Sequence, residues 1–398
     1  MSIEVRFAHS GAWCEERDEN HRKGACVIDC DVHNAWDSAQ VLLPYLDRTY
    51  RDYLERGELP GGRDSFPHAH RAWLHPEGYM RYDAIPPGDA IPGGDYAFMR
   101  DQLLDPYDLD YAILLGDEGV EVSTLANPYY ASALARAHND WVLDAWAPLD
   151  DRLRVSIVVA PQDPHGAAAE IRRLGGHPKV AQALVTSASQ RPYGDPLYHP
   201  IWEAANEMGL PIAAHLGGTG GVNVGPTGTG NPTFFWEAHA MLAETGMGHI
   251  ASVLSHGLPE KYPNTAFVLV ECGVAWVPPI LWRLDADYQA LRKETPWLKR
   301  LPSEYARDFV RITTQPLERP NNPEGMWASL DDIGAREMLM FASDYPHWDF
   351  DDPFLTRFPA EWRDDVFDGN ARRLYKLPDR RADAAGSPAG EETARAGA

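Results

Sequence analysis

The feature that most constrains the fold is a series of short apolar runs, rich in β-branched residues, that alternate with segments of helical periodicity. The runs are residues 25–31, 109–115, 153–160, 180–185, 210–215, 266–271, 311–314 and 338–343. Runs this apolar are typical of strands buried on both faces, as in parallel sheets. The helical patterns between them fall at about 128–146, 165–174, 200–208, 233–254 and 277–291. They supply the crossover connections that parallel strands need.

Eight strands with intervening helices predict an α/β protein with a closed (β/α)8 TIM barrel. An open, doubly wound sheet is the main alternative. That fold usually carries a glycine-rich turn after its first strand, and this chain instead reads DVHNAW at 31–36. A length of 398 residues suits one such barrel with insertions, so we favour the barrel.

Composition divides the chain into a barrel and four less regular stretches. We assign residues 1–24 to an N-terminal extension and residues 25–377 to the barrel. A stretch at about 37–105, rich in Pro, Gly and aromatic residues, is expected to be an insertion after the first strand that covers the barrel mouth. A glycine-rich loop at 215–232 is expected at the same end. The Ala-, Gly- and Glu-rich residues 378–398 are expected to be a disordered tail.

Charge and cysteine content restrict the possible binding partners of the protein and the cellular compartment in which it is expected. The chain has 59 acidic and 36 basic residues, a formal net charge of −23, which argues against binding a nucleic-acid backbone. No apolar run approaches the roughly 20 residues of a membrane-spanning helix, and the N-terminus lacks the pattern of a secretory signal. The four cysteines form no paired C-x-x-C motifs. We therefore expect a reduced, cytoplasmic protein that acts on a small molecule, with no membrane or nucleic-acid partner.

The polar residues at the predicted strand ends point to a metal site. Active sites of these barrels lie at the carboxyl ends of the strands. Asp31 and His33 end the first strand and point the same way, because alternate residues of a strand share a face. His215 ends the fifth strand and Asp344 follows the eighth. One strand-end histidine is more often structural than ligating, but these four together can surround one divalent ion such as Zn²⁺, Mn²⁺ or Fe²⁺.

The same residues belong to a wider resemblance. The opening D-x-D-x-H at 29–33 resembles the first-strand motifs of the amidohydrolase superfamily. More narrowly, the chain is similar to the amidohydrolase-related group that includes aminocarboxymuconate-semialdehyde decarboxylase and the resorcylate-type decarboxylases. The further landmarks are PIAAHLGG at 211–218, EKYPNTAFVLVECG at 260–273, SDYPH at 343–347 and GNARRLYKL at 369–377. Together they span residues 25–377.

This resemblance implies a mononuclear metal site. Asp31 and His33 match the family's first-strand ligands, His215 the strand-five ligand and Asp344 the strand-eight aspartate. In the family that aspartate also acts as a proton shuttle. A metal lowers the pKa of a bound water to about 7, and a neighbouring carboxylate can take its proton. Members are commonly dimers or larger, so the resemblance also implies a homo-oligomer.

Two departures from the family pattern affect this site. Asp31 stands where many members have histidine, which makes the ligand set harder and makes Mn²⁺ plausible beside Zn²⁺, our first expectation. Glu271, in ECGVAW, stands where members usually have a strand-six histidine. It is either a general acid/base, or a group that only holds a nearby His or Arg. His239 and His256, upstream of Glu271, are the candidates to supply the missing imidazole.

Substrate contacts are expected around the metal. The candidates are Trp36, Trp236, Trp276, Trp348, His239, Arg283 and His347. His347 ranks above the tryptophans because it lies in the family-like SDYPH. Arg283 falls where members also carry arginine; the alternative is that it is a helix-surface or interface residue. His68 and His70 lie in the insertion with no preceding strand, so we interpret them as surface histidines rather than as a second metal site.

Three functions are consistent with these residues. The first is hydrolysis of a small cyclic or aromatic substrate by a metal-activated water, with Asp344 as base and Glu271 or a nearby histidine as acid. The second is non-oxidative decarboxylation of an aromatic or unsaturated carboxylic acid. The third is a metal-free binding protein. The missing strand-six histidine weakens decarboxylation, so from the sequence we favour hydrolysis; the presence of all four ligands argues against the metal-free barrel.

Overall fold

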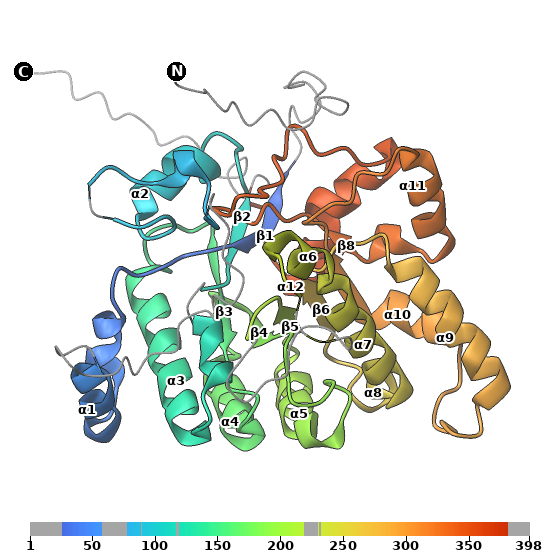
Figure 1. Ribbon diagram of the computed structural model, residues 1–398, viewed down its shortest axis with the longest axis horizontal. Helices are drawn as coiled ribbons and strands as arrows, with labels where there is room; N and C mark the ends of the chain where they lie inside the picture. The colour runs from blue at the N-terminus through green and yellow to red at the C-terminus, as the bar shows by residue number, and fades with distance from the viewer. Residues whose placement is uncertain are drawn as a thin grey trace, which may run out of the picture.

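The computed structural model describes residues 26–57, 78–88, 90–116, 119–218, 230 and 232–380. Within them, eight parallel strands pair in chain order, from β1 to β8 (Figure 1). The bounds are β1 Ile28–Val32, β2 Tyr111–Leu114, β3 Leu153–Val158, β4 Val180–Thr186, β5 Ile212–His215, β6 Phe267–Val270, β7 Val310–Thr313 and β8 Leu339–Met340. β8 is shorter than the predicted run at 338–343.

The residues after β8 close the sheet onto β1. The backbone N–H of Cys30 donates to Phe341 O at 3.0 Å, and that of His33 donates to Tyr345 O at 2.8 Å. In the other direction, the N–H of Asp344 donates to Asp31 O at 3.1 Å. The predicted (β/α)8 barrel is therefore confirmed.

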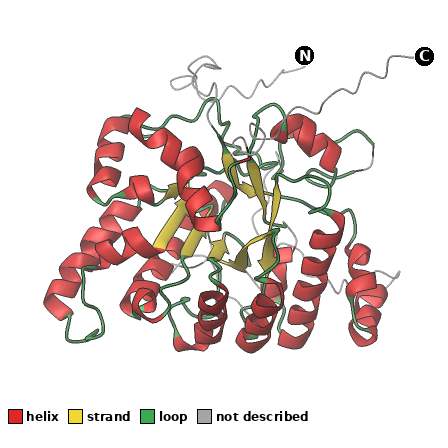
Figure 2. Ribbon diagram, turned by 180° about the vertical axis from the view of Figure 1, so that it is seen from behind, coloured by secondary structure: helices red, strands yellow, loops and turns green. Residues whose placement is uncertain are grey.

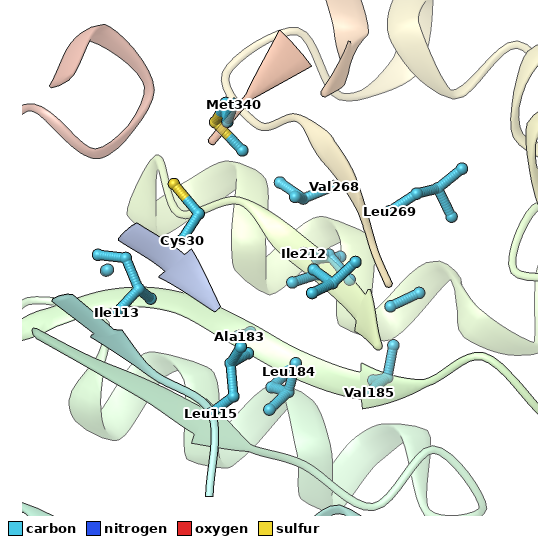
Figure 3. Packing of buried hydrophobic residues seen from close by; sticks show 14 of the residues in the cluster. Cys30, Ile113, Leu115, Ala183, Leu184, Val185, Ile212, Val268, Leu269 and Met340 are labelled. Carbon is cyan, nitrogen blue, oxygen red and sulfur yellow. The ribbon is translucent and has the colours of Figure 1, made fainter. Parts of the chain in front are cut away.

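Apolar side chains of the strands fill the barrel and the layer beneath the helices. Most strand residues are fully buried, and Figure 3 shows side chains from β1, β2, β4, β5, β6 and β8 in this core. Cys30, Ile212 and Met340 are among them. Packing on both faces explains why the strands read as continuous apolar runs rather than as alternating ones.

Helices surround the strands (Figure 2). Their bounds are α3 Pro128–Ala145, α4 Pro164–Leu174, α5 His199–Met208, α6 Phe235–Ala240, α7 Leu242–Ser255, α8 Leu258–Lys261, α9 Val277–Leu291, α10 Pro302–Phe309, α11 Pro323–Asp332 and α12 Asn370–Tyr375. Local sequence determines where these helices begin. At the start of α3, the Asn127 side chain accepts hydrogen bonds from Tyr129 N and Tyr130 N, and Pro128 is the first helical residue. The single helix expected at 233–254 is divided, because Met241 separates α6 from α7.

The described parts of the predicted insertion contain α1 Arg48–Gly57 and α2 Tyr96–Met99, with three short 3₁₀ or π segments, η2 Ala39–Tyr45, η3 Tyr82–Ala84 and η4 Arg100–Leu104. Part of it lies against the loop after β8. The N–H of Arg81 donates to Pro346 O at 2.9 Å, and that of Trp348 donates to Tyr79 O at 3.0 Å. This segment therefore packs at the carboxyl end of the barrel.

Some expectations fall outside the described residues. They are the extension at 1–24, His68 and His70, most of the loop at 215–232, and the tail beyond residue 380. Among the helices of the described ranges, none combines the length and the apolar character needed to cross a membrane.

Candidate metal centre

The end of β1 positions Asp31 and His33. Asp29 lies two residues before Asp31 on the same strand. Its Oδ1 accepts hydrogen bonds from Asp31 N at 3.2 Å and from Ser343 N at 2.9 Å, which connects β1 to the residues after β8. The imidazole Nε2 of His33 lies 3.1 Å from Asp31 Oδ1 and 3.0 Å from Asp344 Oδ1. Asp31 and His33 are both buried. Two strand ends thus bring one imidazole between two carboxylates.

His215, at the end of β5, faces the same point. Its Nδ1 bonds to the carbonyl oxygen of Leu216, which assigns the proton to Nδ1 and leaves the lone pair on Nε2. That Nε2 lies 3.6 Å from Asp31 Oδ2 and 3.4 Å from Glu271 Oε2. The turn that follows requires glycine: Gly218 has φ +72°, and a Cβ there would lie 2.5 Å from Ser123 Oγ.

Asp344 and Glu271 hold their carboxylates on left-handed backbone. Their φ angles are +60° and +58°, a backbone conformation that residues other than glycine adopt at an energetic cost. The Glu271 N–H donates to Thr313 Oγ1 at 3.1 Å, which fixes the turn after β6 against β7. Strain of this kind concentrates at functional sites, and here it re-aims the side chain that follows each strand.

The charges around these carboxylates set their protonation. Burial raises the pKa of Glu271 well above its usual range, and the negative charges of Asp344 and Asp349 raise it further. Asp344 is equally buried, but His347 and His33 overcome the effect of burial and hold the pKa of Asp344 well below its usual range. The pKa of Asp31 is also lowered, because the neighbouring His215 and His33 outweigh the effect of burial. Two of the predicted ligands therefore stay ionised.

The structure brings together all four predicted ligands. Ligand atoms of Asp31, His33 and His215 lie within 4.8 Å of one another, as do those of Asp31, Glu271 and Asp344. Within the described ranges, neither oxygen of Asp31 nor Nε2 of His215 has a hydrogen-bond partner, although both side chains are buried. Buried polar atoms are normally satisfied, so these atoms fit a cation at their centre.

Two further predicted residues adjoin this cluster. His347 Nδ1 lies 2.7 Å from Asp344 Oδ1 and orients that carboxylate. His239, on α6, lies with Nε2 3.0 Å from Asp349 Oδ2, and its ligand atoms group with those of Glu271 and Asp349.

The structure does not bring His256 or Arg283 to the cluster. His256 follows the carboxyl end of α7, where its charge acts on Asp195 and His199. Arg283 is exposed on α9, in agreement with the helix-surface alternative.

The tryptophans have mixed positions. Trp36 packs edge-on against Trp141 of α3, with ring centroids 5.1 Å apart, and Trp276 donates its indole N–H to Cys272 O at 2.7 Å. Both are buried and brace the core, so their prediction as substrate contacts gains no support. Trp236 is 72% exposed on α6. The Trp348 ring lies 5.5 Å from the His239 ring.

Two residues of the site were not predicted. Gln315, two residues after β7, donates its side-chain N–H to Asp344 Oδ2 at 3.2 Å and to Asp349 Oδ2 at 2.8 Å. Asp349 follows Asp344 by five residues in SDYPHWD. The only signal in the sequence was their position just beyond strand ends, which they share with many structural residues.

Comparison with known proteins agrees with this geometry. The amidohydrolase family matches residues 28–377. The chain belongs to this family. It is 25% identical over 292 residues to the gamma-resorcylate decarboxylase of Rhodococcus jostii, a match that covers 70% of this chain and 84% of the relative. It is therefore an enzyme of the amidohydrolase superfamily, and the resemblance inferred from its motifs is confirmed.

Solved structures share the fold. A 5-carboxyvanillate decarboxylase of Novosphingobium aromaticivorans, crystallised with manganese and 4-hydroxy-3-methoxy-5-nitrobenzoic acid, superimposes with a TM-score of 0.65 at 22% identity, over 91% of this chain and 100% of that one. An amidohydrolase of Mycobacterium avium subsp. paratuberculosis gives 0.64 at 19% identity, over 88% and 99%. At these identities the likeness establishes the barrel architecture alone.

Proposed function

We propose that this enzyme is a divalent-cation-dependent decarboxylase of an aromatic carboxylic acid. The observation that carries the proposal is the buried set of ligand atoms at the carboxyl ends of β1, β5 and β8, in a chain related to a gamma-resorcylate decarboxylase over 70% of its length. The sequence alone favoured hydrolysis, because the strand-six histidine is missing. The relatives support decarboxylation instead, and the ligand set gives no support to a metal-free binding protein.

Asp31, His33, His215 and Asp344 would hold the cation. Two carboxylates and two imidazoles form a set that both Mn²⁺ and Zn²⁺ accept, and the manganese in the Novosphingobium enzyme supports Mn²⁺. When bound, the cation supplies positive charge that binds the substrate carboxylate with an adjacent oxygen and stabilises negative charge developing on the ring.

The protein side chains then have two tasks. Loss of the carboxylate as CO2 leaves the bonding electron pair on the ring carbon, so one proton must reach that carbon. Asp344 would move this proton, because it belongs to the ligand cluster and its carboxylate is oriented by His347 and Gln315. Burial of the site excludes water that would otherwise compete as a proton source.

The experiment compares two reactions in one preparation. The metal-loaded enzyme is offered hydroxybenzoates that include 2,6-dihydroxybenzoate and 5-carboxyvanillate, and CO2 release is measured. The same preparation is offered a panel of lactones and amides, and hydrolysis is measured. We expect metal-dependent CO2 release from at least one aromatic acid and no comparable hydrolysis. Hydrolysis without any CO2 release would reverse the assignment.

Two expectations stay predictions: that the protein is a homo-oligomer, and that it is cytoplasmic.

A further inference from the structure

We propose that His239, Asp349 and Glu271 form a second divalent-cation site beside the first, with Glu271 shared between the two. The three residues come from different elements: α6, the loop after β8, and the turn after β6. Their ligand atoms all lie within 4.8 Å of one another. The inference builds on the proposed function in one respect, that the neighbouring first site holds a cation.

The contact between His239 and Asp349 has the geometry of two ligands of one ion. His239 Nε2 lies 3.0 Å from Asp349 Oδ2, yet Nε2 makes no hydrogen bond within the described residues. A nitrogen and an oxygen this close without a hydrogen bond between them have the spacing of two ligands of one ion. Two ligands about 2.1 Å from an ion, at right angles, lie about 3.0 Å apart. At the first site, His33 Nε2 lies at nearly the same distances, 3.1 and 3.0 Å, from its two carboxylates.

Glu271 provides independent support, because its side chain is buried and faces a histidine rather than a fixed cation. Its side chain is 7% exposed and its ion pair is with His215, at 3.4 Å. In the described ranges no donor forms a hydrogen bond to its carboxylate. A buried carboxylate in this state needs either a proton or a cation. Its ligand atoms group both with Asp31 and Asp344 and with His239 and Asp349, so it lies where a bridging ligand would.

The charge of the whole cluster favours two cations over one. Asp31, Glu271, Asp344 and Asp349 converge here, and in the described part of the chain all their ion pairs are with histidines. Histidines that bind metal through a ring nitrogen are neutral, so they cannot also balance these charges. One divalent ion balances two of the four carboxylates, and His347, which is a ligand of neither site, can carry a positive charge beside Asp344. Once Glu271 is ionised, as a metal ligand must be, one carboxylate stays unbalanced, and the second divalent ion compensates it.

Gln315 connects the two sites. Its amide donates to Asp344 Oδ2 of the first site and to Asp349 Oδ2 of the second. An amide that orients one carboxylate of each site is the kind of outer contact that fixes metal ligands in place. A second ion here would add a positive charge for a further oxygen of an aromatic acid, such as a ring hydroxyl next to the carboxylate.

The test is a count of bound ions. Protein stripped with a chelator is dialysed against Mn²⁺ alone, and bound manganese per chain is measured by mass spectrometry for the wild type, His239→Ala, Asp349→Asn and a control, His256→Ala. We expect two ions in the wild type and in the control, and one in each site variant. Electron paramagnetic resonance of the wild type should show a spin-coupled pair of Mn²⁺ ions, and that of either variant an isolated ion. Circular dichroism checks that each variant is folded, and the wild-type spectrum tests the pair if a variant fails to fold.

The outcomes separate this inference from the proposed function. One ion in the wild type with an isolated-ion spectrum, unchanged in His239→Ala, would overturn the second site and leave the first intact; His239 would then be an ion-pair partner of Asp349. Two ions that persist in both variants would also overturn it, because the second ion would lie elsewhere. No bound ion in any protein would reject both the second site and the proposed function.

Discussion

The two ends of the barrel both gather acidic side chains, but they neutralise them differently. At the amino ends of the strands, Asp110 and Asp368 share Arg372, whose guanidinium lies 2.7 Å from Asp110. At the carboxyl ends, the carboxylates of the metal centre are paired with histidines. A guanidinium is permanently charged, whereas a neutral imidazole offers a lone pair. The first arrangement is complete in itself, and the second needs a cation.

Proximity alone does not separate the two ends. Cys26, Asp110 and Asp368 also place ligand atoms within 4.8 Å of one another, as the residues of the metal centre do. Arg372 already occupies the position where an ion would bind, so we interpret the amino end as structural. The comparison teaches that a metal centre is distinguished by the absence of a fixed cation among its carboxylates, and the following variants test that distinction.

The largest effect is expected at the carboxyl end, from His215→Ala. Removing this ligand should lower both bound metal and turnover by more than about 100-fold, beyond the 10–100-fold typical of residues that only support a ligand. Metal analysis and a CO2-release assay measure the two quantities. Unfolding in the presence of a chelator should match that of the wild type. Full activity in this variant would mean that the centre lies elsewhere.

At the amino end, Arg372→Met should cost stability rather than metal. It removes the buried ion pair between Arg372 and Asp110, and removing one side of a buried pair costs about 3 kcal/mol. Urea unfolding in chelator should detect this loss, while the folded variant binds as much metal as the wild type. A loss of metal without a loss of stability would contradict the division between the two ends.

A smaller effect is expected for Gln315→Ala, which removes the amide between Asp344 and Asp349. Metal affinity should fall by about 10–100-fold, because the ligands lose an orienting contact but remain present. Gln162→Ala is the matched control, since the Gln162 amide donates to Val122 O and Leu125 O and does not contact the centre. Equal losses in both variants would indicate a general destabilisation.

The smallest effect is expected for His256→Ala. His256 lies beside Asp195 and His199, so metal content and turnover should stay within about twofold of the wild type. A large loss of turnover with unchanged metal would restore His256 as a catalytic candidate.

The convergence of the proposed ligands was predictable because most of them lie at strand ends. Asp31 and His33 share a face by alternation along β1, and His215 ends an apolar run. Parallel strands in a barrel bring their carboxyl ends to one place, so the fold and the grouping of these residues follow from local patterns, whereas Asp344 lies in the loop after β8. The resemblance to known motifs made the same assignment.

The remaining site residues could not be predicted in this way. Gln315 and Asp349 lie in loops after β7 and β8, where no periodicity determines which side chains turn inward. His239 was predicted as a candidate imidazole, but the division of the expected helix at 233–254 into α6 and α7 at Met241 was not. Trp36 and Trp276 stay predictions as substrate contacts: Trp36 packs against Trp141 of α3, and Trp276 donates its indole N–H to the turn after β6.

The most direct test of this account is the metal content of three purified proteins: the wild type, His215→Ala and Arg372→Met. Each is stripped, reloaded with Mn²⁺ or Zn²⁺ and analysed for bound ions. The account predicts at least one divalent ion per chain in the wild type and the same amount in Arg372→Met. In His215→Ala it predicts that metal affinity falls by more than about 100-fold, so that much less metal stays bound. A wild-type protein that holds no metal after reloading would contradict it.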